Sequence, residues 1–208
     1  KEIAMTNNIS NNYDKIYSEN KTTFGTEPMP LVEKVLEYIK SGKVIEFGAG
    51  EGRNSLFLAS KGFQVVAVDI SPVAIEKINE KAKTENIVLE TRIADIIRVD
   101  FADPYDLMIC TFTLHHLTRE QAIKFIEKMK QGTKSGGYNL ITSFTKNGDF
   151  YRKDPTTEKF YLNENELKDL YQDWEILTYF EKEGKTFAKN PDVTPMVNVF
   201  SGMIAKKI

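Results

Sequence analysis

An acid and three glycines alternate in one short stretch of the chain, Glu46-Phe47-Gly48-Ala49-Gly50-Glu51-Gly52. A glycine turn of this kind lets a ligand approach the backbone, and a helix that starts behind it offers free N–H groups. A second acid, Asp69, closes the next apolar run and can bind a ribose diol. Together these residues predict half of a nucleotide-binding α/β unit.

The glycine spacing differs from the two best-known nucleotide fingerprints. The dinucleotide pattern G-x-G-x-x-G would need a third glycine where Arg53 or Ser55 stands. A Walker loop would need Gly-Lys-Ser/Thr after the turn, which Gly52-Arg53-Asn54 does not provide. An acid at the end of the first strand, Glu46, suits a cationic ligand with a free amino group. Beside a pyrophosphate the negative charge of Glu46 would be repelled by the phosphate charges.

The two histidines of the chain are neighbours, His115 and His116. A histidine there can accept a proton from a nucleophile or hydrogen-bond to it, and the alternative is a packed or capping imidazole. We predict no metal site, because no other histidine and only one cysteine are available as ligands. That cysteine, Cys110, is predicted to be a buried apolar thiol.

The elements that must position these residues alternate between strand and helix. Residues 44–47 form a short apolar run before the glycines, and 65–68 is an unbroken apolar run typical of a buried parallel strand. Ser71-Pro72 opens a helix, and Thr118 begins a capping box. The predicted strands are 44–47, 65–68, 87–93, 107–112, 138–144, 174–180 and 196–205, the helices 31–39, 54–60, 72–84, 120–130 and 164–173, and the irregular loops 145–159 and 184–195.

Length and composition bound the class of protein. A chain of 208 residues has the size of one α/β domain, which we expect to span 1–208 with a leading segment at 1–40 and a core at 41–208. A net charge of −2 and a pI near 5.9 argue against a nucleic-acid or membrane partner. No apolar run reaches a membrane span of about 20 residues, and no secretory signal is recognisable. One cysteine suits a reducing compartment, so we expect a cytoplasmic protein.

The acid-glycine turn, its flanking strands and Asp69 resemble the class I S-adenosylmethionine-dependent methyltransferases. The resemblance implies a Rossmann-like α/β fold with a seven-stranded, mostly parallel sheet and helices on both faces. The last strand of such a sheet runs antiparallel, and we expect it at the sheet edge. The resemblance also implies that the turn lies under the methionine part of the cofactor and that Asp69 holds the ribose hydroxyls.

Further cofactor contacts follow from the same resemblance. Asp95 would cap the exocyclic amine of adenine, although a turn-forming aspartate is the alternative. The carbonyls of Cys110 and Thr111 would lie near the methionine amine. The leading segment 13–25 would fold over the cofactor as a lid, or else would be a surface helix anchored by its aromatics. The cofactor-binding residues predicted are Glu46, Phe47, Gly48, Gly50, Gly52, Asp69, Ile70, Ala94, Asp95, Ile96, Cys110 and Thr111, and the catalytic residues predicted are His115 and His116.

Several motifs are similar to one branch of these enzymes, the tellurite-resistance methyltransferase family: FGTEP, GEGRNSLFLASKGF, CTFTLHHL and KSGGYNLI. That family is linked to methylation of tellurium and selenium oxyanions. Its members carry a catalytic His-Arg pair after a glycine in the last loop. Aligned on Gly184, this sequence has Phe187 and Ala188 at those positions, so the roles of the pair have no counterpart here.

We therefore expect a methyltransferase that acts on a small molecule, as a monomer or homodimer. Tellurite, selenite or another soft nucleophile would be methylated by in-line transfer. An anionic acceptor would want cations at the mouth of the site, offered by Arg152, Lys153, Lys182, Lys185 and Lys189. The alternative is a non-catalytic S-adenosylmethionine-binding protein used for partner recognition. A nucleic-acid methyltransferase is disfavoured, because the Asn/Asp-Pro-Pro-aromatic signature is absent after the fourth strand.

Overall fold

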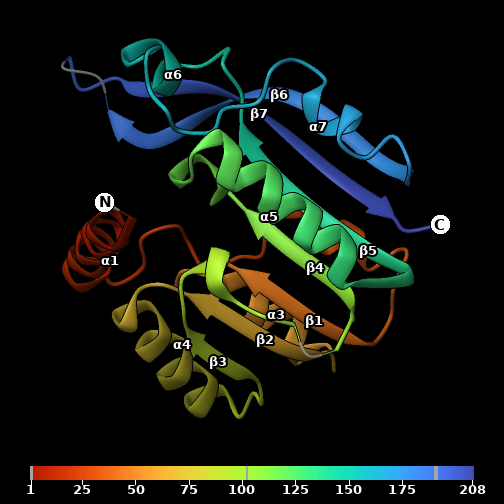
Figure 1. The fold of residues 1–208 in the computed structure, drawn as a ribbon. Coiled ribbons are helices and arrows are strands. Elements are labelled where there is room, and N and C mark those ends of the chain that lie inside the picture. The colour runs from red at the N-terminus through yellow and green to blue at the C-terminus, as the bar shows by residue number, and fades with distance from the viewer. Residues whose placement is uncertain (1, 102, 190–191) are drawn as a thin grey trace.

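A computed structural model describes residues 2–101, 103–189 and 192–208, with the side chains of 2–8, 187 and 189 outside that description. Helices and strands alternate along the chain as the apolar runs predict (Figure 1). The helices are α1 Glu2–Glu19, α2 Pro30–Val35, α3 Arg53–Ser60, α4 Pro72–Glu85, α5 Arg119–Gly132, α6 Asp149–Lys153 and α7 Glu166–Asp169, with 3₁₀ turns η1 Ile96–Arg98 and η2 Leu114–His116. The strands are β1 Lys43–Phe47, β2 Gln64–Asp69, β3 Glu90–Ile93, β4 Tyr105–Thr111, β5 Thr133–Phe144, β6 Glu175–Lys189 and β7 Pro195–Lys206.

The strands form one seven-stranded sheet in the order β3-β2-β1-β4-β5-β7-β6. β1 pairs in parallel with β2 on one side and with β4 on the other. From β1 the chain first adds β2 and β3 on one side of the sheet. It then crosses over and adds β4 and β5 on the other side of β1. Such a reversal opens a crevice at the carboxyl ends of the central strands, where open α/β sheets bind ligands. The predicted Rossmann-like fold is confirmed.

One detail of the predicted topology is wrong. β7 runs antiparallel, as expected, but it lies between β5 and β6 and not at the sheet edge. The edge belongs to β6. Pairing on both sides buries the C-terminal part of β7, where Met203, Ile204 and Ala205 are fully buried. A strand with such an apolar run is more stable inside a sheet than along its exposed edge.

Helices cover both faces of the sheet. Phe125, Ile126 and Met129 of α5 pack on one face, together with side chains around α7. α2 and α3 pack on the opposite face through residues such as Val32 and Leu58, and α4 packs there beside β2. Alternate residues of the buried strands point to the two faces, so unbroken apolar runs are needed to fill both layers.

The predicted helix starts are confirmed by their caps. The Ser71 hydroxyl accepts a hydrogen bond from the Ala74 N–H at the start of α4. Thr118 and Gln121 form a reciprocal capping box at the start of α5. Both caps satisfy backbone N–H groups that a helix leaves unpaired at its first turn.

The C-terminal third departs from the predicted pattern. Residues 184–195 were expected to be irregular, but β6 continues to Lys189 and β7 begins at Pro195, so the two strands form a long hairpin. The predicted loop 145–159 contains α6, and the helix expected over 164–173 is only the short α7. Residues 184–189 form a strand because they pair with β7. The sequence of this segment alone does not reveal that partner.

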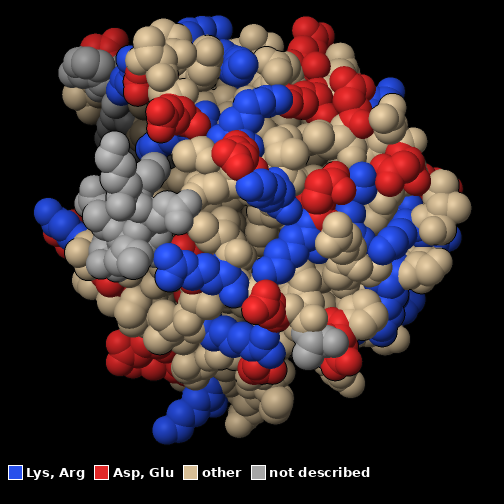
Figure 2. Space-filling view, viewed as in Figure 1, with Lys and Arg blue, Asp and Glu red and all other residues tan. Residues whose placement is uncertain are grey.

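No helix in the described ranges is both long and apolar enough to cross a membrane. The face over α5 mixes basic and acidic side chains (Figure 2). Lys124 pairs with Glu120 there, and Lys128 pairs with Asp100. This face therefore presents no surface of a single charge.

Candidate active site

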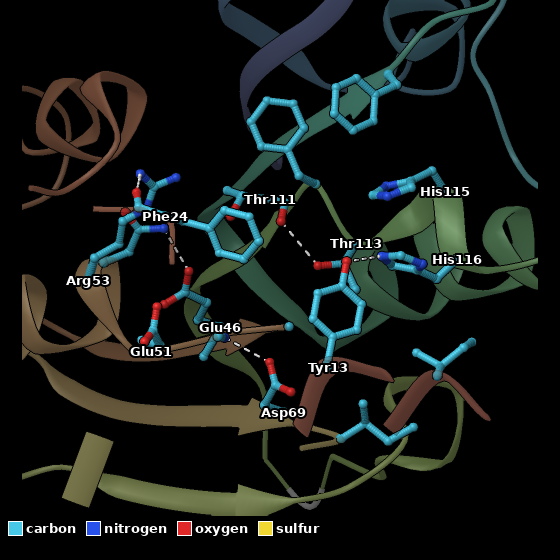
Figure 3. A pocket seen from close by; sticks show the side chains of 18 of the residues that line it. Tyr13, Phe24, Glu46, Glu51, Arg53, Asp69, Thr111, Thr113, His115 and His116 are labelled. Atoms are coloured by element: carbon cyan, nitrogen blue, oxygen red, sulfur yellow. Dashed lines mark hydrogen bonds between the residues drawn. The ribbon is translucent and has the colours of Figure 1, made fainter. Parts of the chain in front are cut away.

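A cavity of about 500 Å³ opens at the carboxyl ends of the central strands (Figure 3). Helix α1 covers it from one side, at the left of Figure 1, and the β6–β7 hairpin borders it from another. Most of the predicted site residues line it: Glu46, Gly48, Gly50, Asp69, Ile70, Asp95, Ile96, Thr111, His115 and His116.

Four predicted cofactor residues are not among those that line the cavity. Phe47 is fully buried and packs edge to face on Phe125, with ring centroids 4.9 Å apart. Ala94 packs against the same core, and Cys110 is fully buried within it. Burial raises the pKa of the Cys110 thiol far above its usual range, which agrees with the predicted inert thiol.

Gly52 is the fourth of these residues, and its role is structural. It has φ of 79° at the start of α3, and a Cβ there would lie 2.7 Å from Cγ1 of Ile78 in α4. Only glycine satisfies both conditions without strain. Gly52 therefore allows α3 and α4 to approach each other.

Gly48 and Gly50 shape the turn under the cavity. Their φ angles are 67° and 55°, a left-handed region that favours glycine. A Cβ on Gly48 would overlap the side chain of Thr113, and one on Gly50 would lie 3.1 Å from the Tyr17 hydroxyl. The turn is therefore packed closely between α1 and the segment that follows β4.

Glu46 is a buried acid at the end of β1. Its carboxylate accepts hydrogen bonds from Nδ2 of Asn54 at 2.8 Å and from Oγ of Ser55 at 2.5 Å. Burial raises the pKa of Glu46 to about 7, although these hydrogen bonds and Arg53 act in the opposite direction. A cationic group bound nearby would favour the ionised form, because opposite charges attract strongly where water is excluded.

Asp69 ends β2 and connects three parts of the site. Its Oδ2 accepts the Gly50 N–H at 2.7 Å and its Oδ1 accepts the Ser71 N–H at 2.9 Å. Burial raises the pKa of this carboxyl, and the backbone N–H groups counteract the rise. The side chain thus fixes the glycine turn relative to α4. Asp95, one strand further out, caps η1 by accepting the Ile97 N–H at 3.2 Å.

The two histidines lie together on η2, with ring centroids 4.0 Å apart. His116 Nε2 is 2.9 Å from the hydroxyl of Tyr13 on α1. His115 Nδ1 is buried and has no hydrogen-bond partner among the described residues. Burial lowers the pKa of His116 to about 4 and that of His115 well below 6.5, so both imidazoles are neutral near pH 7.

Helix α1 lies over one side of the cavity. Its Tyr17 is only 4% exposed. The Ser10 hydroxyl donates to the Ile70 carbonyl at 3.2 Å, and the Ser71 hydroxyl donates to Asp14 at 2.5 Å. These contacts attach α1 to the turn between β2 and α4.

The segment after α1 is held by the turn itself. Arg53 donates to the Phe24 carbonyl at 2.7 Å, and Glu51 accepts the Thr23 N–H at 2.6 Å. Lys77 of α4 contacts the same Glu51 at 2.8 Å. The contacts of Glu51 and Arg53 could not be predicted from the sequence, because their partners lie outside the glycine motif.

Four phenylalanines of the cavity wall were also missed: Phe112, Phe144, Phe150 and Phe200. They come from β5, α6, β7 and the residue after β4, so no single stretch of sequence reveals them as a group. Phe150 lies within 145–159, which was predicted to be an irregular loop. Phe112, just beyond β4, has φ of 50°, which is unusual for a residue with a side chain.

The cations expected at the mouth are mostly engaged elsewhere. Arg152 lies 3.3 Å from Asp149, and Lys182 lies over the rings of Phe180 and Phe200. Lys185 lines the cavity with an exposed side chain. The side chains of Phe187 and Lys189 lie outside the described part. Within that part, no group of three His, Cys, Asp or Glu residues could hold a metal ion.

Comparison with known proteins identifies the family of this chain. Residues 7–196 match the family model described as tellurite resistance protein TehB. A protein of Haemophilus influenzae named probable S-adenosyl-L-methionine-dependent methyltransferase TehB is 34% identical over 165 residues, covering 79% of this chain and 57% of that protein. The chain thus spans little more than half the length of the curated relatives it matches first.

Solved structures show the same architecture. The crystal structure of TehB from Haemophilus influenzae superposes with a TM-score of 0.79 at 30% identity, covering 94% of this chain and 67% of that one. The N-methyltransferase NodS from Bradyrhizobium japonicum, solved with S-adenosyl-l-homocysteine, superposes with a TM-score of 0.71 at 15% identity, which supports the fold alone. It covers 95% of this chain and 97% of NodS. On the family match and the 34% identity, this chain belongs to the tellurite resistance protein TehB family.

Proposed function

We propose that this chain transfers a methyl group from S-adenosylmethionine to a small-molecule acceptor. Its family supports this, because the curated Haemophilus members are named probable S-adenosyl-L-methionine-dependent methyltransferases. One observation carries the proposal: a single cavity joins the acid-glycine turn, Asp69 and the histidine pair. It lies where open α/β sheets bind ligands.

The residues of the cavity fit S-adenosylmethionine. Gly48 and Gly50 provide a turn without side chains, into which a Cβ would not fit without movement of Thr113 or Tyr17. Glu46 offers a carboxylate for the ligand's amino group, and Asp69 offers one for its ribose hydroxyls. When bound, the cofactor would supply a methyl group on a sulfonium. The group that leaves on transfer is a neutral thioether, which needs no proton.

The chain's own contribution is mainly positioning. Orientation of two reactants can account for about 7–11 kcal/mol of a barrier in favourable cases. Here α1 and the wall phenylalanines would exclude water from the space beside the sulfonium. His115 and His116, neutral near pH 7, would hydrogen-bond to the acceptor or take its proton. Tyr13 would hold the His116 ring in place.

The acceptor is proposed to be a soft nucleophile, with tellurite and selenite as family candidates. A soft nucleophile needs little help from a general base, which suits a site whose imidazoles have lowered pKa values. Phe187 and Ala188 stand where the family's His-Arg pair is expected, so an oxyanion would have to be held by other groups.

The test combines binding with turnover. Calorimetry measures the affinity of the purified chain for S-adenosylmethionine. Release of S-adenosylhomocysteine is then followed with tellurite, selenite, small thiols, catechols and amines. Binding with turnover of any of these acceptors supports the proposal. Binding without turnover would favour the alternative, a non-catalytic cofactor-binding protein. The absence of binding would contradict both.

A further inference from the structure

The part of the cavity that faces away from the glycine turn is built from aromatic rings. Phe112 lies 4.8 Å from Phe144 and 5.3 Å from Phe200, measured between ring centroids. Phe144 lies 4.9 Å from Phe150, and the ring of His115 meets Phe144 edge to face at 5.0 Å. We call these four phenylalanines and His115 the acceptor chamber. Its walls meet a bound molecule mainly with carbon atoms.

Two features hold the chamber in shape. Phe112 keeps its left-handed backbone while its N–H donates to the Thr142 carbonyl at 2.9 Å. Such a conformation in a bulky residue is strained and persists only where surrounding contacts impose it. Asn198, buried in β7, accepts the Phe150 N–H at 2.8 Å and so fixes α6 against the hairpin. The rings are therefore positioned before a ligand arrives.

The chamber offers little to a charged acceptor. Among the described residues that line this half of the cavity, Lys185 is the only one with a full charge, and its side chain is exposed to water. The exposed Lys159 acts on His115 from outside the lining. A hydrated oxyanion would lose its water against phenyl rings, and a solvent-exposed lysine compensates poorly for that loss. A protonated amine would find ring faces, but its nitrogen has no free electron pair until a base takes a proton.

The chamber does offer one polar atom that lacks a partner. His115 Nδ1 is buried without a hydrogen bond in the described part of the protein. Buried polar atoms in native proteins are nearly always paired, so this atom needs a bound ligand or a water molecule as its partner. A ligand with an apolar body and one weakly acidic group would contact the phenyl rings and donate a hydrogen bond to the His115 imidazole.

We propose that the methyl acceptor is an uncharged thiol with an apolar body, held by the ring walls of the acceptor chamber with its sulfur beside His115. The inference rests on the proposed methyltransferase function and narrows its substrate class. A thiol is a stronger acid than an alcohol, and its thiolate is intrinsically very nucleophilic. Its polarisable sulfur also makes favourable contacts with aromatic rings.

The proposed step is balanced without any further reactant. The S–H proton of the thiol passes to the His115 imidazole. A sulfur electron pair forms the new bond to the methyl carbon, and the electron pair of the breaking bond stays on the cofactor sulfur. The products are a neutral methyl sulfide and S-adenosylhomocysteine, and the imidazolium releases its proton to water.

A series of n-alkanethiols from ethanethiol to hexanethiol tests this, because their S–H groups have the same chemistry while the apolar body grows. Each added methylene is expected to raise kcat/KM by about three- to fourfold, which corresponds to about 0.8 kcal/mol per buried CH₂. Selenite and tellurite are measured beside them and are expected to fall below hexanethiol.

A pair of variants on one short helix locates the effect. Phe150→Ala removes a chamber ring and is expected to lower kcat/KM for hexanethiol tenfold or more, while ethanethiol changes less than twofold. Tyr151→Ala is the matched control, because Tyr151 packs on Tyr161 and is not among the residues that line the cavity. It is expected to leave the chain-length dependence unchanged.

A binding readout keeps the inference testable without turnover. The methyl sulfides of the same thiols are titrated into the protein saturated with S-adenosylhomocysteine, and affinity should rise with chain length in the same way. If sulfides bind with that trend but no acceptor is methylated, the chamber assignment stands and the proposed methyl transfer fails. A flat dependence in both assays, or a higher kcat/KM for an oxyanion than for hexanethiol, would overturn the thiol assignment.

Discussion

The phenolic oxygen of Tyr13 lies 2.9 Å from Nε2 of His116, although 103 residues separate them in the chain. Their rings meet edge to face, with centroids 5.3 Å apart (Figure 3). Tyr13 is on the covering helix α1, and His116 follows the central strand β4. The contact therefore joins helix α1 to the residues proposed to handle the acceptor.

Tyr13→Phe is expected to lower kcat/KM about fivefold, with little change in S-adenosylmethionine affinity. The variant keeps the ring but removes one hydrogen bond, worth about 1 kcal/mol. Steady-state kinetics and calorimetry separate the two effects. Tyr38→Phe is the control, because its hydroxyl bonds to Thr178 at 3.3 Å, away from the cavity. An unchanged kcat/KM in Tyr13→Phe would show that His116 needs no such partner.

Asp69→Ala is expected to weaken S-adenosylmethionine binding about ten- to hundredfold. A hydrogen bond to a charged group contributes about 1.5–3 kcal/mol, and the carboxylate also holds the glycine turn through the Gly50 N–H. Calorimetric titration measures the loss, and thermal unfolding checks that the variant is folded. Asp100→Ala, at an exposed salt bridge with Lys128, serves as the control. Wild-type affinity in Asp69→Ala would remove this residue from the cofactor site.

Gly50→Ala and Gly62→Ala form a matched pair. Both glycines have positive φ, 55° and 89°, so each alanine is strained by on the order of 1 kcal/mol. A Cβ at Gly50 lies 3.1 Å from the Tyr17 hydroxyl, whereas none of the surrounding atoms is within 4 Å at Gly62. Both variants should lose similar thermal stability. Only Gly50→Ala should also lose cofactor affinity, and equal affinities would mean that the turn does not contact the ligand.

Glu46 should make the ligand-free protein less stable as pH rises. Burial raises its folded-state pKa to about 7, above the usual value near 4.5, so the protonated carboxyl favours the folded state. That contribution is complete below about pH 4.5 and is lost as pH rises through about 7. Urea unfolding between pH 5 and 8 should show a fall on the order of 2–3 kcal/mol in the wild type relative to Glu46→Gln. Exposed Glu80→Gln should keep the wild-type slope.

Binding of a cation beside Glu46 should reverse this protonation. If the ligand's amino group stabilises the carboxylate, S-adenosylmethionine binding near pH 7 releases a proton. Calorimetry in two buffers of different ionisation enthalpy measures that release. Glu46→Gln should abolish it, whereas proton release that persists in the variant would assign the linkage to another group.

Local sequence determined much of this protein. The spacing of Glu46, the glycines and Asp69 was sufficient to predict the turn and the acid at the next strand end, because each requirement concerns only a few neighbouring residues. The caps at Ser71 and Thr118 were likewise readable, since a cap bonds to backbone within its own helical turn. Unbroken apolar runs predicted the buried parallel strands.

Tertiary structure alone decided which distant residues meet. Tyr13 and His116 approach only because α1 packs across the carboxyl ends of the strands. The acceptor chamber gathers phenylalanines from β5, α6, β7 and the residue after β4. β7 lies between β5 and β6, and its pairing with β6 forms the hairpin that borders the cavity. Strand partners and long-range contacts depend on packing over the whole sheet, and the energy differences that select them are not encoded in any short stretch of sequence.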